Sequence, residues 1–211
     1  MNGKITHEDL LLGHAAGRLP APLALLVRTQ LALSAEARKR YALYAALAGV
    51  LLERLEPARL RADAWERLER AIDRVEPAAP EARHAGDPRV PPPLRRYAPR
   101  GFERLPWRKF GPLYEVELPV RGDGFRTRLI RLGPGAGVPR HTHAGHELTL
   151  VIEGSFRDAQ GLHRRGDLVI ADPSVEHAPV AEEECLCLWV ADAPLKLTGP
   201  LGRLLNPFLR I

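Results

Sequence analysis

Cysteine is scarce in this chain, with two residues among 211. Both lie in the sequence Cys185-Leu-Cys187-Leu-Trp, where they alternate with leucine and would share one face of a strand. A disulfide between residues two apart has poor geometry, so we interpret the two thiols as small buried packing groups. A redox-sensing pair is the alternative, and it requires exposed thiols or a lowered thiol pKa.

Long apolar runs are also missing. No run approaches the length of a membrane span, and the opening Met-Asn-Gly-Lys-Ile-Thr-His-Glu-Asp lacks the apolar core of a signal peptide. We therefore expect a cytoplasmic protein with no membrane partner.

The chain also lacks a long stretch in which the charged residues all have the same sign. The net charge is +5, but basic and acidic residues alternate along the chain, which is typical of solvated faces. A direct nucleic-acid binder, suggested by Arg95-Arg96-Tyr97-Ala-Pro-Arg100, is the weakest hypothesis because no helix-turn-helix pattern accompanies it. We expect no direct contact with nucleic acid.

The hydrophobic pattern divides the chain in two, as its length also suggests. Helical periodicity predicts helices over 8–16, from Pro22 to residue 33, from residue 35 to about 54 with Ser34 as N-cap, and around Trp65, Leu68, Ile72 and Val75. The last apolar stripe is either core or a surface left for a partner. Prolines then interrupt every periodicity over 77–99, which predicts a linker.

Beyond the prolines the pattern alternates and is punctuated by glycine. It predicts several short strands in a sandwich or barrel, at 113–118, 125–132, 146–152, 167–171 and 185–190. We therefore predict a multidomain α plus β chain, with a helical domain at 1–76, a Pro-rich linker at 77–99 and a β domain at 100–211.

Four candidate metal ligands stand within this β region. His141 and His143 are two apart, so in a strand both side chains leave the same face, and Glu147 follows at an even step. His177 must come from another strand that faces the first. Three imidazoles and one carboxylate suit a divalent transition metal.

The residues around these ligands resemble the two motifs of the cupin superfamily. Gly135 to Gly154 read G-x5-H-x-H-x3-E-x6-G, and a second block runs from Gly166 to His177. In the second block Ala181 replaces the Asn that is common after its His. The resemblance implies a cupin (double-stranded β-helix, jelly-roll) barrel with metal ligands His141, His143, Glu147 and His177. The competing interpretation is that these are surface histidines in a Gly-rich loop.

The two halves together resemble the ChrR family of cupin-containing anti-sigma factors. The resemblance includes Leu-Leu-Leu-Gly-His-Ala-Ala-Gly-Arg-Leu-Pro at 10–20, Trp-Arg-Lys-Phe-Gly-Pro at 107–112, Asp192-Ala-Pro-Leu-Lys and Asn206-Pro-Phe-Leu. It implies that a small N-terminal helical, anti-sigma-like domain clasps an extracytoplasmic-function sigma factor. It also implies that the cupin senses a stress signal, such as singlet oxygen or peroxide chemistry, and triggers release.

The chain departs from the family at the N-terminal zinc site, which is built from an early His and a later H-x3-C-x2-C. His7 matches the early His, but Gln30, Ser34 and Ala37 stand at the other positions. Structural zinc needs about four protein ligands. His14 could share the helix face of His7, but it does not complete a set. We expect no zinc in this domain, which then folds on apolar packing alone and is either a zinc-free sigma-binding domain or a relic.

The family resemblance favours zinc in the cupin, although iron, manganese and nickel suit the same donors. Asp172 or Glu176 could orient a ligand imidazole. Glycines 135, 145 and 154 would permit tight turns, and Gly166 and Pro173 would shape the turn before His177. A homodimer through the cupin is the alternative to a one-to-one complex with a sigma factor.

A different function is a cupin metalloenzyme, dioxygenase- or isomerase-like, acting on a small organic substrate. His146 and His163 are the added acid or base candidates. His146 follows an odd step from His143 and would point outward. The sequence supplies no catalytic residue for this alternative.

Overall fold

The computed structural model describes residues 4–75 and 87–198. Four helices come first: α1 (His7–Ala15), α2 (Ala21–Leu33), α3 (Ala35–Glu53) and α4 (Ala64–Asp73). Two short 3-10 turns, η1 (Pro92–Leu94) and η2 (Phe102–Arg104), precede the strands. Residues 77–86 of the expected linker and the Asn206-Pro-Phe-Leu ending lie outside the described residues.

The strands follow in order. They are β1 (Arg108–Phe110), β2 (Leu113–Gly122), β3 (Phe125–Leu132), β4 (His141–His143), β5 (Glu147–Glu153), β6 (Ser155–Asp158), β7 (Gly161–Arg164), β8 (Leu168–Ala171), β9 (Val180–Ala181), β10 (Cys185–Ala191) and β11 (Leu195–Leu197). Helices therefore precede strands, which confirms the predicted α plus β class.

The helix boundaries follow from local chemistry. Thr6 and Asp9 form a reciprocal capping box at the start of α1, with the Thr6 hydroxyl accepting from the Asp9 amide. Ser34 caps α3 by accepting a hydrogen bond from the Ala37 amide at 3.2 Å, as predicted. Pro22 lies in the first turn of α2, where its missing N–H costs no helical hydrogen bond.

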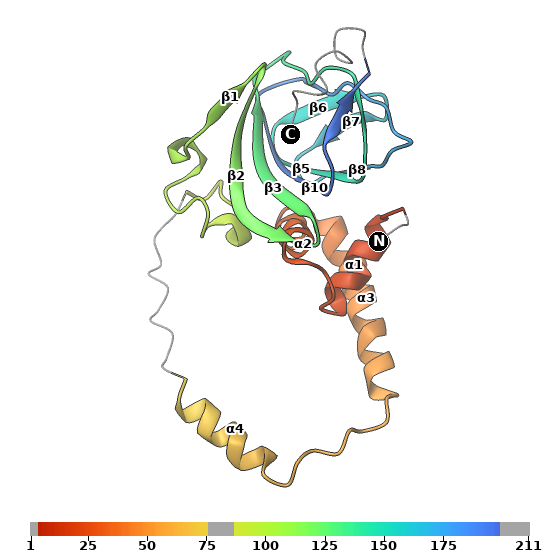
Figure 1. Ribbon diagram of the computed structural model, residues 1–211, viewed down its shortest axis with the longest axis vertical. Coiled ribbons are helices and arrows are strands. Elements are labelled where there is room, and N and C mark those ends of the chain that lie inside the picture. The colour runs from red at the N-terminus through yellow and green to blue at the C-terminus, as the bar shows by residue number, and fades with distance from the viewer. Residues whose placement is uncertain (1–3, 76–86, 199–211) are drawn as a thin grey trace.

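The strands form a barrel with one large wall and two small ones (Figure 1). The large wall is an antiparallel sheet in the order β1-β2-β3-β10-β5-β8. The small walls are β11-β4 and β7-β6-β9, and an isolated bridge joins His141 to His177. This arrangement brings the two sequence motifs to one end of the barrel interior.

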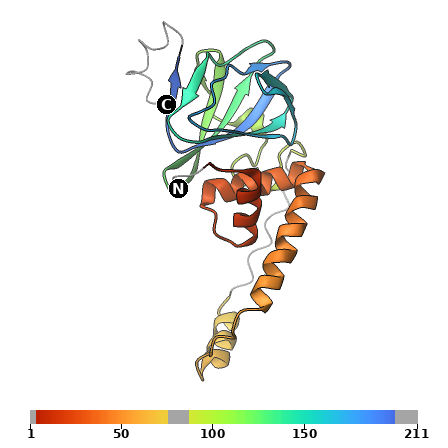
Figure 2. The same cartoon turned by 90° about the vertical axis from the view of Figure 1, so that its right-hand side faces the viewer.

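Helix α2 covers the outer face of the large sheet (Figure 2). Its apolar residues share one core with outward-facing sheet residues. The α2 residues are Leu23, Leu25, Leu26 and Val27, and the sheet residues include Val116, Leu118, Leu129, Leu148, Leu150 and Leu188. The helical region and the barrel are thus joined by a continuous apolar core, so we expect α2 and the sheet to unfold together.

Residues 90–98, in the second part of the predicted linker, also enter this core. Val90, Leu94 and Ala98 are buried, and Leu94 belongs to η1, which contacts α2. Proline fixes the backbone of this segment, while its few apolar side chains attach it to the helices. The domain boundaries at 76 and 99 stay a prediction.

Candidate metal centre

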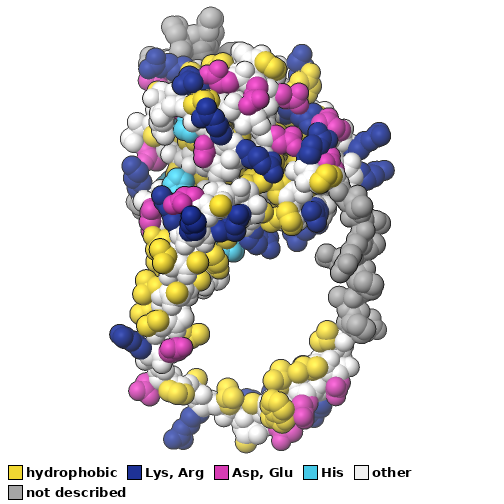
Figure 3. Space-filling view, turned by 180° about the vertical axis from the view of Figure 1, so that it is seen from behind, with side chains coloured by type: hydrophobic (Ala, Val, Ile, Leu, Met, Phe, Trp, Pro, Cys, Tyr) yellow, Lys and Arg dark blue, Asp and Glu magenta, His cyan; other side chains and the backbone are white. Residues whose placement is uncertain are grey.

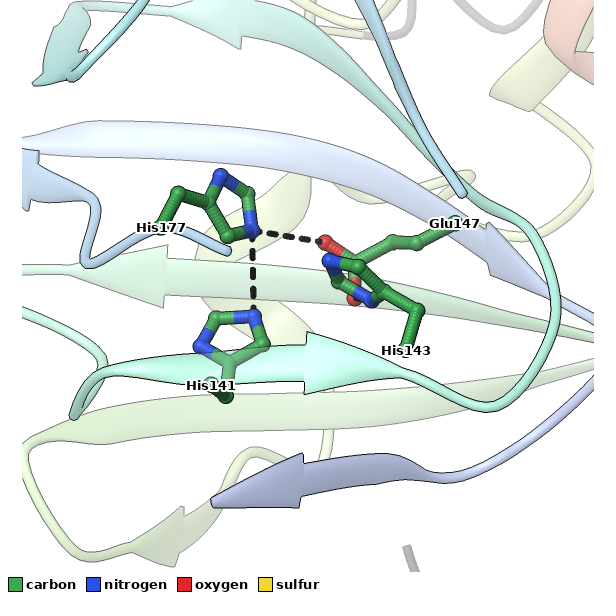
Figure 4. A group of neighbouring side chains, drawn as sticks. All are labelled: His141, His143, Glu147 and His177. Carbon is green, nitrogen blue, oxygen red and sulfur yellow. Dashed lines mark hydrogen bonds and ion pairs between the residues drawn. The ribbon is translucent and has the colours of Figure 1, made fainter. Parts of the chain in front are cut away.

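Three separate segments bring the four predicted ligands together inside the barrel (Figure 4). His141 and His143 project from one face of β4, and Glu147 is the first residue of β5. His177 is held opposite by paired backbone hydrogen bonds with His141, each 3.0 Å long. One ligand atom from each residue lies within 4.8 Å of the other three, and all four residues are buried. The structure thus brings the four predicted residues together in one buried group.

The facing nitrogen atoms indicate what the cluster could hold. The Nδ1 atom of His141 donates to the Pro139 carbonyl at 2.8 Å, and Nδ1 of His177 donates to Asp158 at 3.0 Å. In the neutral imidazole the other ring nitrogen is then a bare acceptor. These two Nε2 atoms face each other at 3.1 Å, and Nε2 of His143 is buried without a hydrogen-bond partner among the described residues.

A divalent cation would satisfy all of these lone pairs at once. The carboxylate of Glu147 completes the set, with Oε1 4.0 Å from His177 Nε2 and Oε2 3.6 Å from His143 Nδ1. Burial lowers the pKa of His143 to about 4 and also lowers the pKa of His141. These rings are therefore neutral near pH 7, which is the form that binds metal. The buried group could hold a metal ion.

Asp158 supports the cluster from the side, and it was not among the residues predicted from the sequence. Its Oδ2 accepts from His177 and its Oδ1 accepts from His163 Nε2, both at 3.0 Å. The carboxylate is fully buried, which raises its pKa, but the hydrogen bonds from His177 and His163 outweigh this and hold the pKa below its usual value. A carboxylate in this position fixes the tautomer and orientation of a ligand imidazole.

The residues expected in that role make other contacts. Asp172 accepts hydrogen bonds from the amide and hydroxyl of Ser174, and Glu176 pairs with Arg140 at 2.9 Å. Asp158 lies at the end of the β6–β7 hairpin, between the two motifs, so its position depends on hairpin register. No spacing rule within either motif could have found it.

The two histidines considered as acids or bases are both held by carboxylates. Nδ1 of His146 lies 3.0 Å from Asp192 Oδ2, and the His146 amide donates to Asp192 Oδ1 at 2.6 Å. His163 binds Asp158 and lies against the Phe156 ring, with centroids 4.9 Å apart. Neither residue lines the cavity beside the cluster.

Two glycines in the first motif are required by close approach. A Cβ atom on Gly154 would lie 1.9 Å from the Glu184 carbonyl oxygen, and the residue has φ +70°. A Cβ atom on Gly145 would lie 2.1 Å from Asp192 Oδ1. Both glycines therefore let neighbouring loops close around the ligand-bearing strands.

A cavity of about 290 Å³ adjoins the cluster, and His141, Glu147 and His177 form part of its wall. Cys187 lines it too. The Cys185 and Cys187 sulfur atoms are buried 3.6 Å apart as free thiols, and the neighbouring Cys185 and burial together raise the pKa of Cys187 well above its usual value. The interpretation of these cysteines as buried packing groups agrees with this burial.

The four positions of the missing N-terminal zinc site also converge. His7, Gln30, Ser34 and Ala37 line one surface pocket together with His163, Gly166 and Leu168 of the barrel. There His7 Nε2 donates to the Leu168 carbonyl at 2.9 Å, and Ser34 is engaged as the α3 cap. His7 thus connects α1 to the barrel.

Fold and site define the class: a cupin barrel with a buried three-His, one-Glu cluster, joined to N-terminal helices. The family model for the ChrR cupin-like domain matches residues 101–196. The anti-sigma-E factor ChrR of Cereibacter sphaeroides is 40% identical over an alignment that covers 97% of this chain and 96% of that protein. The chain belongs to the ChrR anti-sigma factor family.

A solved structure agrees over nearly the whole chain. It is the crystal structure of Rhodobacter sphaeroides SigE in complex with the anti-sigma ChrR, which is 35% identical with a TM-score of 0.76. The match covers 91% of this chain and 100% of that one. Within the described residues, no helix has the length and apolar character needed to cross a membrane.

Proposed function

We propose that this chain sequesters an extracytoplasmic-function sigma factor through its N-terminal helices, and that the metal-binding cupin controls release. Membership of the ChrR family supports this, as does the solved complex of a relative with SigE. Sigma factors act in the cytoplasm, which is then the proposed compartment for this chain.

The observation that carries the proposal is an exposed apolar surface between residues 43 and 75, which we call the apolar arc. The second half of α3, the following connection and α4 extend away from the barrel (Figures 1 and 3). No residue of α4 is buried. The exposed apolar side chains of the arc are Leu43, Leu47, Val50, Leu51, Leu52, Leu55, Leu60, Trp65, Leu68, Ile72 and Val75.

Such a surface is unusual for a chain that functions alone. Trp65 is 66% exposed and Leu60 is 82% exposed, although each would stabilise a complex by roughly 1.5–3 kcal/mol if fully buried. On α4, Trp65, Leu68 and Ile72 share one face, while Glu and Arg occupy the other faces. An amphipathic helix of this kind is suited to bind a groove on a helical partner.

The test is a pair of substitutions on that face. We expect Trp65→Glu with Ile72→Glu to weaken binding of a sigma factor of this class from the source organism by about 100-fold or more, because two apolar anchors are lost. Arg70→Gln, on the opposite face of α4, is the matched control and should change the affinity little. Equal affinity for the double variant would contradict a role for the apolar arc.

We propose that the barrel communicates with the helices through residues 163–168. At one end of this segment His163 binds Asp158, which in turn binds His177. At the other end Leu168 accepts the hydrogen bond from His7. Between them Gly166 approaches the α2–α3 junction, where an added Cβ would lie 3.4 Å from Ser34 Cβ. A shift of His177 on metal loss would therefore reach α1 and α2 within six residues.

Hydrogen exchange tests this route. Chelation of the metal should raise the exchange rates of α1 amides in the native chain. His163→Phe keeps an aromatic ring beside Phe156 but removes the bond to Asp158, so the α1 response should shrink while the response around residues 141–147 remains. Arg164→Ala is the control. An undiminished α1 response in the His163 variant would exclude this segment as the route.

We also propose that His141, His143, Glu147 and His177 bind one zinc ion. Imidazole and carboxylate donors suit zinc in tetrahedral sites, and the family resemblance favours zinc among the divalent metals that these buried residues could hold. Replacing His141 or His177 by Ala should reduce the metal content sharply yet leave the barrel folded, because the apolar core is separate from the cluster. Elemental analysis and circular dichroism of the same samples would check both expectations.

A metalloenzyme remains the second candidate, favoured by the cavity beside the cluster. Turnover of dioxygen with an added small acid or diketone by the iron- or manganese-loaded chain would support it. Besides the cluster, the titratable residues that line the cavity are Glu115, Arg128 and Cys187. No turnover with either metal would leave the anti-sigma function as the sole proposal.

A further inference from the structure

The cavity beside the metal cluster has an apolar wall with two polar regions. Apolar side chains supply most of the wall, among them Phe110, Ile130, Leu132, Phe156, Trp189 and Leu197. Phe110 is 42% exposed, so the cavity meets solvent near β1. The first polar region is the His/Glu cluster, and the second is Arg128 with Glu115.

Arg128 is a buried cation on β3 whose hydrogen-bonding capacity is only partly used. Its Nη1 atom lies 3.4 Å from Glu115 Oε2, and its guanidinium carbon is 5.2 Å from the centre of the Trp189 ring. The residue is 6% exposed, and its Nε–H has no partner among the described residues. A buried N–H without an acceptor is costly, and Arg128 lines the cavity, so a ligand there could contact its guanidinium group.

The sheet register places Arg128 near the metal cluster. Arg128 pairs with Trp189 across β3 and β10, and Trp189 pairs with Thr149 across β10 and β5. Thr149 lies two residues from Glu147, so both point into the cavity. Two strand spacings separate the β3 and β5 positions, on the order of 10 Å. One small molecule can therefore contact both polar regions.

Charge decides which kind of molecule fits. Imidazole binds a metal in its neutral form, so a divalent cation held by the three histidines and the single Glu147 carboxylate leaves one positive charge at the cluster. Arg128 and Glu115 balance each other, so one positive charge remains in the cavity as a whole. A monoanion would neutralise it, whereas a cation would be repelled. A sugar would find too few polar partners on this wall.

We infer that the cavity binds a small amphipathic monoanion, with its head group between the metal and Arg128 and its apolar body toward Phe110. At roughly 30 Å³ for each water-sized group, the cavity has room for about ten non-hydrogen atoms, as in octanoate. The inference goes beyond the proposed function, because binding to the isolated chain does not require a sigma factor.

Calorimetry with the zinc-loaded full chain tests the inference with octanoate, octanol and octylamine as probes. Octanoate should bind at least tenfold more tightly than either of the other two. Arg128→Leu should weaken octanoate binding at least tenfold, and Arg128→Lys should retain part of it. Arg126→Leu is the matched control, since Arg126 is exposed on the same strand and does not line the cavity.

Three results would each overturn the inference. These are no octanoate binding to the native chain, octanol binding as tightly as octanoate, and unchanged octanoate binding in Arg128→Leu. The first two results do not depend on any variant, so a failure of Arg128→Leu to fold would not protect the inference. Zinc content and circular dichroism of each variant show whether its barrel is intact.

Discussion

Asp158→Asn isolates the contribution of the supporting carboxylate to metal binding. In the native chain the two oxygen atoms of Asp158 accept hydrogen bonds from His177 and His163, each 3.0 Å long. Asparagine has nearly the same shape, but it carries no charge and one oxygen becomes an NH2 group, so the charge-assisted hydrogen bond to the ligand ring of His177 is weakened or lost. The side chain is fully buried, and water cannot easily replace the lost bond.

The expected loss is 10- to 100-fold in zinc affinity, or about 1.4–2.8 kcal/mol, because such carboxylates orient a ligand imidazole and raise its basicity. Competition against a chromophoric chelator measures it. Asp172→Asn is the control, since that carboxylate binds Ser174 and no ligand ring. Unchanged affinity in Asp158→Asn, or an equal loss in the control, would refute the reasoning.

Further predictions concern stability. Leu26→Ala should lower the free energy of unfolding by about 2–5 kcal/mol, because Leu26 is fully buried in the core shared by α2 and the sheet. In urea, the unfolding transition followed by helical circular dichroism and the one followed by Trp fluorescence should shift together. Two separate transitions would contradict a shared core. Burial lowers the pKa of His143 to about 4, so between pH 6.5 and about 4 the unfolded chain binds more protons than the folded chain. The free energy of unfolding of the metal-free chain should therefore fall by up to about 3 kcal/mol as the pH is lowered through this range. Urea unfolding at each pH measures this loss. Gly154→Ala should lower the free energy of unfolding by more than about 3 kcal/mol, because the added Cβ would meet the Glu184 carbonyl oxygen. Gly133→Ala, with open space around the added Cβ, should change the stability little. Thermal unfolding of both variants measures the difference. His7→Ala should cost about 0.5–1.5 kcal/mol through the lost bond to Leu168, and no measurable change would show that this bond does not hold α1.

The sequence predicted the metal cluster because even spacing in a strand fixes which side chains share a face. His141 and His143 obey that rule within β4, whereas Glu147 lies on the next strand, β5, and reaches the cluster through the connection between the two strands; His177 joins them from the second motif. Asp158 was not predicted, because its place beside His177 depends on the register of the β6–β7 hairpin. Its distance in sequence from either motif does not indicate that register.

The helices were predicted from caps and apolar periodicity, but their packing was not. Consecutive buried residues Leu25, Leu26 and Val27 show that α2 is covered on several sides by α1, the sheet and the 90–98 segment. A helix that is apolar nearly all round is a sign of such burial, and this sign was available in the sequence. The prolines of residues 90–98 favoured the prediction of a linker, so the burial of Val90 and Leu94, which depends on a long-range contact, was not predicted.

The most direct test of the central claim is light scattering of the zinc-loaded full chain, mixed with an extracytoplasmic-function sigma factor from its source organism, during size-exclusion chromatography. We expect a one-to-one complex at micromolar concentration, with one zinc ion per chain. If the chain elutes alone, or only as its own dimer, beside unbound sigma factor, the anti-sigma function is contradicted.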